Sequence, residues 1–305
     1  MKKTILSVAM ACLSLTSWAQ PQMQIQPGAE PTWKDINYAG DDMEAHRLDI
    51  YLPKTQQDRY KVIVIIYGSA WFANNAKGMA YTSIGKPLTD AGFAVVSINH
   101  RSSGDAKYPA QINDVKGALR FIRANADKYK LDTSFVGITG FSSGGHLSSM
   151  AGVTNGLKTR TIGEKTIDIE GTVGGNEKCS SEVDAVVDWF GPVDMTRMNN
   201  CDTVNDDKSP EAALIDGNPA DNMDMIQLCS PYFYVSKTTA PFLVIHGNAD
   251  TVVPYCQSVN FSEELKSQGK LTDFITVPEG QHGPVTFNED TFKKMTDFFK
   301  KEAKM

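Results

Sequence analysis

The sequence predicts an α/β fold, a mostly parallel sheet with helices on both faces and two insertions over one edge. Strand-like and helix-like segments alternate along the 305 residues. Residues 61–67 (KVIVIIY) and 93–99 (FAVVSIN) are continuously apolar and rich in β-branched side chains, which is typical of strands buried on both faces. Residues 109–130 carry apolar side chains three or four positions apart, which predicts a long amphipathic helix. Together these patterns indicate parallel strands joined by helices.

The remaining elements follow in chain order. Gly92 ends an apolar helical pattern, and short apolar runs bounded by Gly, Pro or Asp indicate further strands. Strands are expected at residues 46–52, 61–67, 93–99, 135–140, 183–190, 241–246 and 273–277, and helices at 82–91, 109–130, 144–151, 258–268 and 291–303. Residues 154–181 and 194–230 interrupt the alternation. Because long loops in compact domains are usually functional, we interpret both as insertions over the edge of the sheet at which the functional residues are expected.

Composition narrows the class of protein. Hydrophobic residues make up 41% of the chain and charged residues 22%, which excludes a disordered, collagen-like or polytopic membrane protein. The net charge of −6 argues against a nucleic-acid partner, because such proteins usually carry a basic surface.

The N-terminus has the pattern of a secretory signal peptide. Two lysines precede an apolar run, and small residues at Ser17 and Ala19 predict cleavage after Ala19. The run is shorter than the ~20 residues that span a bilayer. A lipoprotein anchored at Cys12 is the alternative, but the residues before Cys12 form a poor lipobox. We therefore expect a signal peptide over 1–19, a flexible lead-in over 20–34, one domain over 35–305, and a secreted or periplasmic protein.

Export changes what the cysteines indicate. The four that follow the signal peptide allow up to two disulfides in an oxidising compartment, and sequence does not rank the three possible pairings. The absence of a C-x-x-C pair argues against a zinc or thioredoxin-like site. These cysteines are Cys179, Cys201, Cys229 and Cys256.

A candidate nucleophile lies between a predicted strand and a predicted helix. Residues 140–144 (GFSSG) match G-x-S-x-G, a tight turn that presents the central serine, Ser142, at the head of a sheet. The N-terminus of the following helix favours negative charge there. In this context an ordinary glycine-rich turn is the less favoured interpretation.

A serine nucleophile needs a base that is held by an acid. His282 follows the last predicted strand and is the candidate base, and Asp250 follows the strand before it and is the candidate acid, which is the chain order of such hydrolases. Asp194, one strand earlier, is the rival acid. His246 is interpreted as a structural residue that hydrogen-bonds to the Asp250 loop.

Backbone N–H groups must stabilise the oxyanion. Ser143, directly after the nucleophile, supplies one, and Ser69 and Ala70 in the loop after strand 61–67 are the other candidates. A plain turn that packs Trp71 is the alternative for this loop. Trp71 is also a candidate substrate-binding residue.

Together these residues resemble the α/β-hydrolase superfamily over roughly residues 35–303, and more narrowly its secreted carbohydrate-esterase branch, which includes acetyl xylan and feruloyl esterases and hormone-sensitive-lipase-like carboxylesterases. The resemblance implies that Ser142, Asp250 and His282 form the triad. The family's usual His-Gly-Gly-Gly-Trp loop is changed here, since Tyr67 replaces the histidine and Ser69 and Ala70 replace glycines. His146 is a candidate for substrate binding or for support beneath this loop. Arg101, Asp105 and Asp114 are interpreted as structural.

The resemblance and the predicted export imply a secreted serine esterase that removes acetyl or feruloyl groups from plant polysaccharide through an acyl-enzyme. No cofactor, metal or nucleic acid is expected, and the expected partner is the ester substrate. Two alternatives stay open: a peptidase of the prolyl oligopeptidase type, and a non-catalytic binding protein of the same fold.

Overall fold

The structure, a computed structural model, describes residues 30–305. Its centre is an eight-stranded sheet with the order β1-β2-β4-β3-β5-β8-β9-β10. The pairs β1–β2 and β2–β4 are antiparallel, and all the others are parallel. The strands are β1 (Trp33–Asn37), β2 (Arg47–Tyr51), β3 (Tyr60–Ile66), β4 (Ala94–Ile98), β5 (Leu131–Phe141), β8 (Ala185–Trp189), β9 (Phe242–Gly247) and β10 (Leu271–Val277).

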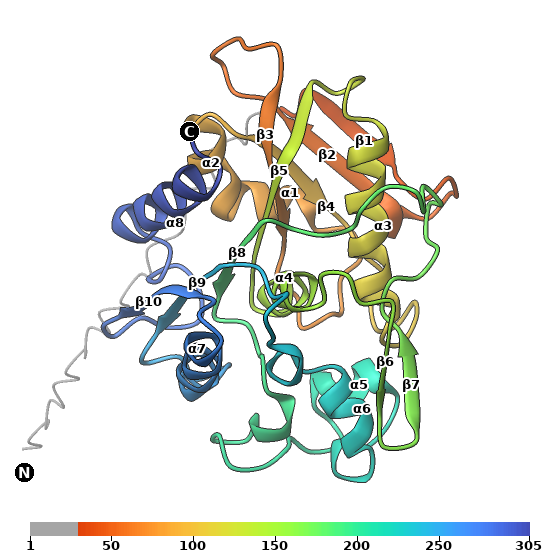
Figure 1. Cartoon of the computed structure of the whole chain (residues 1–305). Helices are drawn as coiled ribbons and strands as arrows, with labels where there is room; N and C mark the ends of the chain where they lie inside the picture. The colour runs from red at the N-terminus through yellow and green to blue at the C-terminus, as the bar shows by residue number, and fades with distance from the viewer. Residues whose placement is uncertain (1–29) are drawn as a thin grey trace, which may run out of the picture.

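Helices cover both faces of this sheet (Figure 1). Alternate residues of β3 enter two separate hydrophobic cores: Val62 and Val64 pack with residues of α3, α4 and α7, whereas Ile63 and Ile65 pack with residues of α2 and α8. This two-sided burial explains why the strand is apolar throughout. The helices are α1 (Lys77–Ala80), α2 (Lys86–Asp90), α3 (Ala110–Ala124), α4 (Ser143–Val153), α5 (Pro210–Ile215), α6 (Met223–Leu228), α7 (Cys256–Ser267) and α8 (Glu289–Glu302).

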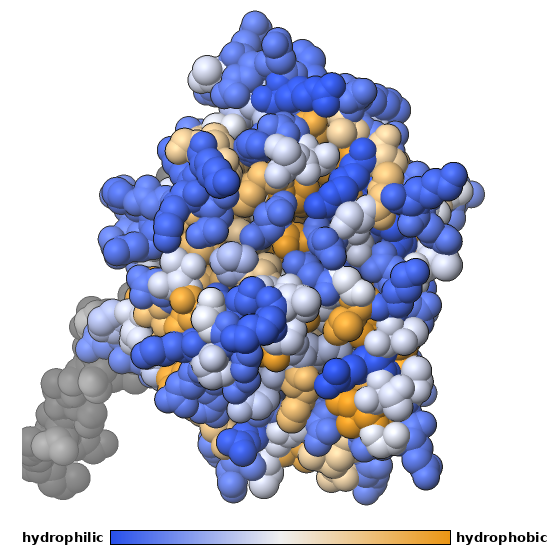
Figure 2. Space-filling view, in the orientation of Figure 1, coloured by the Kyte–Doolittle hydropathy of each residue, from blue (hydrophilic) through white to orange (hydrophobic). Residues whose placement is uncertain are grey.

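The surface in the same orientation is mostly hydrophilic, with hydrophobic patches between the polar side chains (Figure 2). No helix within residues 30–305 is long and apolar enough to cross a membrane. The predicted signal peptide and most of the predicted lead-in lie outside the described residues. Strand β1 begins at Trp33, two residues before the boundary expected at residue 35.

The two long insertions contain more regular structure than expected. The first holds the hairpin of β6 (Thr159–Ile162) and β7 (Lys165–Asp168), and the second holds α5 and α6. The first lies along α3, where Arg120 donates hydrogen bonds to the carbonyls of Glu170, Val173 and Gly175. Its hairpin also contacts α6 of the second insertion, so the two insertions lie side by side.

Candidate active site

The turn after β5 has the geometry of a nucleophile elbow. Ser142 adopts φ 57° and ψ −127°, and its N–H donates to the carbonyl of Trp189 at 2.9 Å. A Cβ atom at Gly144 would lie 2.3 Å from the carbonyl oxygen of Ile66, and one at Gly140 would lie 2.3 Å from the carbonyl oxygen of Gly144. Only glycine fits these two positions, and the turn consequently presents Ser142 at the carboxyl end of the sheet.

The structure brings Ser142, His282 and Asp250 into one hydrogen-bonded chain. The Ser142 Oγ lies 2.9 Å from His282 Nε2, and His282 Nδ1 lies 2.7 Å from Asp250 Oδ2. A carboxylate only accepts, so the Nδ1 atom carries the proton and Nε2 is free to accept the hydroxyl proton of Ser142. This is the tautomer in which an imidazole acts as a general base.

Asp250 is held as a carboxylate by four donors. The N–H groups of Val252 and Val253 donate to Oδ1, at 2.8 and 3.0 Å, while His246 Nε2 shares Oδ2 with His282. Burial raises the pKa of the Asp250 carboxyl, but the hydrogen bonds from His246 and His282 and the charge of His282 outweigh it, so that the pKa lies well below its usual range.

The residues around the triad also have clear places. His246 Nδ1 lies 2.7 Å from the Ser258 hydroxyl, and its Nε2 lies within hydrogen-bond distance of both Asp250 and the Val253 carbonyl, as expected for a residue that supports the acid loop. The rival acid, Asp194, instead accepts from the N–H and hydroxyl of Thr196. Of the two candidate acids, Asp250 is therefore the one that is hydrogen-bonded to His282.

One of the expected oxyanion donors, in the loop that contains Ser69, Ala70 and Trp71, is corrected by the structure. The Ser69 N–H donates to the Ser143 hydroxyl at 2.9 Å, and is therefore not available to a substrate. The N–H groups of Ser143 and Ala70 have no acceptor within residues 30–305. Ala70 and Trp71 adopt φ 51° and 61°, the left-handed region that favours glycine. Ala70, which replaces a glycine of the family's loop, therefore keeps a backbone conformation that glycine adopts more easily.

His146 lies below the loop, where it has no contact with solvent. Its Nδ1 accepts from Trp71 Nε1 at 3.1 Å, and its Nε2 donates to the Cys229 carbonyl at 2.7 Å. Burial lowers the pKa of His146 to about 4, so the ring stays neutral at physiological pH. The expectation that His146 binds substrate is corrected, because both nitrogens are occupied, and it acts by orienting Trp71.

Arg101, Asp105 and Asp114 tie a loop to α3, as their interpretation as structural residues requires. The Arg101 guanidinium and backbone N–H donate to the buried Asp114 carboxylate. Asp105 accepts from Ser102 and Asn74. Within residues 30–305, no group of three His, Cys, Asp or Glu side chains is arranged to hold a metal ion.

A pocket of about 170 Å³ opens beside Ser142. Trp71 lines it together with residues of the second insertion and of the Asp250 loop that sequence analysis did not select as site residues. The lining residues are Ala70, Trp71, Ser142, Ser143, Pro192, Met198, Asn205, Pro210, Glu211, Val252 and Val253. Four of them lie in the second insertion, which carries no sequence motif that could have marked them.

One disulfide joins the two loops of this pocket. Cys201, between Met198 and Asn205, is bonded to Cys256, three residues after Val253. Cys229 is buried and Cys179 is partly exposed, both as free thiols. The sequence allowed up to two disulfides, and the structure contains this one within the described residues.

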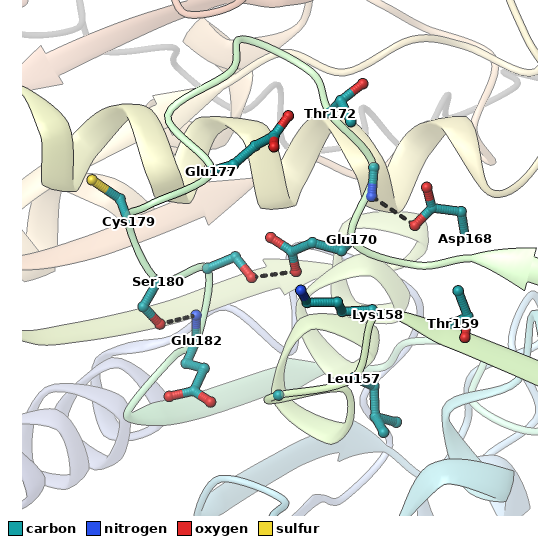
Figure 3. Close-up of a pocket in the computed structure, with 13 residues that line it drawn as sticks. Leu157, Lys158, Thr159, Asp168, Glu170, Thr172, Glu177, Cys179, Ser180 and Glu182 are labelled. Atoms are coloured by element: carbon teal, nitrogen blue, oxygen red, sulfur yellow. Dashed lines mark hydrogen bonds between the residues drawn. The ribbon is translucent and has the colours of Figure 1, made fainter.

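A larger cavity of about 490 Å³ lies in the first insertion, beside α3 (Figure 3). The carboxylates of Glu170, Glu177 and Glu182 surround it, and Glu170 accepts from the Ser181 hydroxyl at 2.7 Å. It shares no lining residue with the Ser142 pocket. Of its acidic side chains, Glu170 is also bound to the chain itself, through an ion pair with Arg120.

A buried carboxyl beneath the elbow gives stability a pH dependence. Asp188 Oδ1 accepts from the Gly191 N–H at 3.1 Å, and Oδ2 has no partner among the described residues. Burial raises the pKa of Asp188 to about 7. Because the folded pKa exceeds the unfolded value of about 3.9, the stability contributed by the protonated group is present below about pH 4 and is lost as the pH rises to about 7.

We therefore expect Asp188→Asn, which stays neutral, to flatten the pH dependence of stability. Between pH 5 and pH 8, the wild type should lose roughly 2–3 kcal/mol more free energy of unfolding than the variant. Urea denaturation at both pH values measures this difference, with Asp207→Asn at an exposed site as the control. Equal pH dependence in the wild type and Asp188→Asn would contradict the expectation.

Comparison with known proteins shows which family the chain resembles. The BD-FAE family model matches residues 48–265. The chain is 32% identical over 254 residues to a probable carboxylic ester hydrolase, LipM, of Mycobacterium tuberculosis, an alignment covering 81% of this chain and 55% of the relative. It is 30% identical over 227 residues to the esterase LipQ of the same organism, covering 73% and 50%. The chain thus spans about half the length of these curated relatives.

Two solved structures are more similar. A bifunctional GH43-CE of Bacteroides eggerthii is 68% identical with a TM-score of 0.88, over 89% of this chain and 35% of that one. A truncated carbohydrate esterase from gut microbiota is 58% identical with a TM-score of 0.88, over 90% and 96%. These similarities confirm the predicted α/β-hydrolase fold and carbohydrate-esterase branch. They also confirm the predicted enzyme class, because the relatives are named as esterases or carboxylic ester hydrolases.

Proposed function

The chain belongs to the BD-FAE family of α/β-hydrolases, and we propose that it is a serine ester hydrolase that works through an acyl-enzyme. The observation that carries the proposal is the hydrogen-bonded chain from Ser142 through His282 to Asp250. A serine hydroxyl in contact with the free nitrogen of an oriented imidazole is the arrangement that activates it as a nucleophile.

In the first half of the reaction, the Ser142 Oγ attacks the ester carbonyl while His282 Nε2 takes its proton. The carbonyl electron pair moves onto the oxygen, where the N–H groups of Ser143 and Ala70 stabilise it; a single such donor contributes about 10²–10³-fold in rate. The intermediate then collapses, the ester C–O bond breaks, and His282 returns the proton to the leaving alcohol. Asp250 stabilises the imidazolium without taking the proton.

In the second half, water takes the place of the alcohol. His282 removes a proton from the water as its oxygen attacks the acyl carbon, the bond to Ser142 breaks, and the proton passes to the serine. The products are a carboxylic acid and the regenerated enzyme, so that the cycle needs no further co-reactant.

The substrate that we propose is an acetyl or feruloyl ester on plant polysaccharide. The high identity to a protein named as a carbohydrate esterase supports a carbohydrate-linked ester. Exposed apolar side chains follow closely after residues of the site and offer contact surface to a substrate larger than the pocket: Phe72 after Trp71, Val252 after Asp250 and Val285 after His282.

We also propose that the protein is exported. The N-terminal sequence supports this, with two lysines, an apolar run and small residues before the expected cleavage after Ala19. The disulfide between Cys201 and Cys256 is compatible with an oxidising compartment.

The test is a substrate panel with the purified protein: acetylated xylan, a feruloylated arabinoxylan fragment, nitrophenyl acetate and an aminoacyl nitroanilide. We expect acid release from at least one polysaccharide. Hydrolysis of nitrophenyl acetate alone would support the ester hydrolase activity but refute the proposal that polysaccharide is the substrate. Cleavage of the nitroanilide would assign a peptidase, and no hydrolysis at all would leave a binding protein.

A further inference from the structure

Glu211 is a carboxylate in the wall of the Ser142 pocket with no role in the reaction described above. It lies in the first turn of α5 and is only 3% exposed. Most of the other side chains around the pocket are apolar, among them Trp71, Met198 and Val253. A charged group in such surroundings is costly unless hydrogen bonds compensate it, so its partners decide what it does.

Within residues 30–305, Glu211 receives one hydrogen bond from a side chain, from Asn205 Nδ2 to its Oε2 at 3.1 Å. An ionised carboxylate accepts about four hydrogen bonds. Its Oε1 has no partner in that part of the chain, and no Lys, Arg or His side chain forms an ion pair with it. Glu211 thus has accepting capacity left over, at the edge of a cavity that reaches the nucleophile.

Two other buried carboxylates of this chain have more hydrogen-bond and ion-pair partners. Asp114 is paired with Arg101 and His46, and Asp49 accepts from Lys77 and from a backbone N–H. Neither of these lines the Ser142 pocket, and neither does the buried Asp188, whose Oδ2 also lacks a partner among the described residues. Glu211 therefore has an unused hydrogen-bond acceptor and also faces the pocket. A hydrogen-bond donor on the substrate would account for both observations.

We propose that Glu211, positioned by Asn205, accepts a hydrogen bond from a hydroxyl group of the bound ester and so determines which esters the enzyme prefers. The inference rests on the proposed ester hydrolysis. A hydroxyl donor suits the site because it is neutral and small enough for a pocket of about 170 Å³. The hydroxyl has two possible sources, the sugar that carries the ester or the phenol ring of a hydroxycinnamoyl group.

Two matched pairs of esters distinguish these sources. trans-2-Hydroxycyclohexyl acetate and cyclohexyl acetate differ by one hydroxyl in the alcohol half, and methyl 4-hydroxycinnamate and methyl cinnamate differ by the phenol hydroxyl in the acyl half. We expect the wild type to prefer the hydroxylated member of one pair. A buried hydrogen bond to a charged acceptor corresponds to about 10- to 100-fold in kcat/KM.

The variant Glu211→Gln keeps the shape and removes the charge, and should reduce that preference about tenfold or more. Asn205→Ala should reduce it in the same direction, which keeps the test valid if the first variant folds poorly. Asp207→Asn, an exposed carboxylate of the same insertion, is the control and should keep the wild-type ratio.

An unchanged ratio in both Glu211→Gln and Asn205→Ala would overturn the proposal while leaving ester hydrolysis intact. A preference for an amine-bearing ester that disappears in Glu211→Gln would also overturn it, since Glu211 would then bind a cation. Failure of the wild type to hydrolyse any ester would refute the proposed function itself, so the two failures are distinguishable.

Discussion

Replacing Ser142 with alanine is expected to lower kcat/KM for ester hydrolysis by about 10⁵- to 10⁶-fold, because the attacking oxygen is lost while the fold is kept. Serine nucleophiles of comparable triads show losses of that order. Initial rates on nitrophenyl acetate measure the effect, and a fluorophosphonate probe should add its mass to the wild type and not to Ser142→Ala.

Ser148→Ala is the matched control for this prediction. Ser148 lies on the same helix, α4, and its buried hydroxyl has no hydrogen-bond partner among the described residues. This variant should keep rate and labelling near those of the wild type. If Ser142→Ala retained more than about a thousandth of the wild-type rate, Ser142 would not be the nucleophile.

Replacing Asp250 with asparagine is expected to lower kcat by about 10⁴-fold, because the amide can donate to His282 Nδ1 and so favour the wrong tautomer. The binding of substrate should change much less, since Asp250 Oδ2 contacts His282 and His246 rather than the pocket. Steady-state kinetics that separate kcat from KM test this expectation.

Asp194→Asn is the control for this second prediction, because Asp194 accepts from Thr196 and does not contact His282. The kcat of this variant should stay within a few-fold of the wild-type value. The opposite result, with Asp194→Asn inactive and Asp250→Asn active, would assign the acid to the earlier strand. Because the pKa of Asp250 lies well below its usual range, a loss of activity near pH 6 would not arise from protonation of this residue.

The sequence was sufficient for features that depend on local pattern. The apolar runs at β3 and β4 predicted the parallel core, and the elbow at Ser142 was recognisable from its glycines. The differences arise where the structure depends on distant contacts. Strand β1 is short, partly exposed and at the sheet edge, so it carries no buried pattern. Helix α3 ends at Ala124 rather than near residue 130, where polar residues continue in turns.

In the site too, local sequence pattern predicted some features, and others depend on distant contacts. The order of Ser142, Asp250 and His282 along the chain suggested which residues meet, and this did not require knowledge of distances. The occupied N–H of Ser69 depends on a contact with Ser143, 74 positions away, which no local motif encodes. Glu211 lies in the short helix α5, inside an insertion that carries no sequence motif, and its place in the pocket wall depends on how residues 194–211 fold back over the sheet.

The bond between Cys201 and Cys256 has a consequence for the breadth of substrates that the pocket admits. One cysteine follows Met198 and the other follows Val253, and these two residues line the pocket from different loops. Their separation is therefore limited by a covalent bond as well as by packing. Reduction of this bond would remove the covalent part of that limit and leave packing alone to set the space beside Ser142, although neither cysteine belongs to the catalytic machinery.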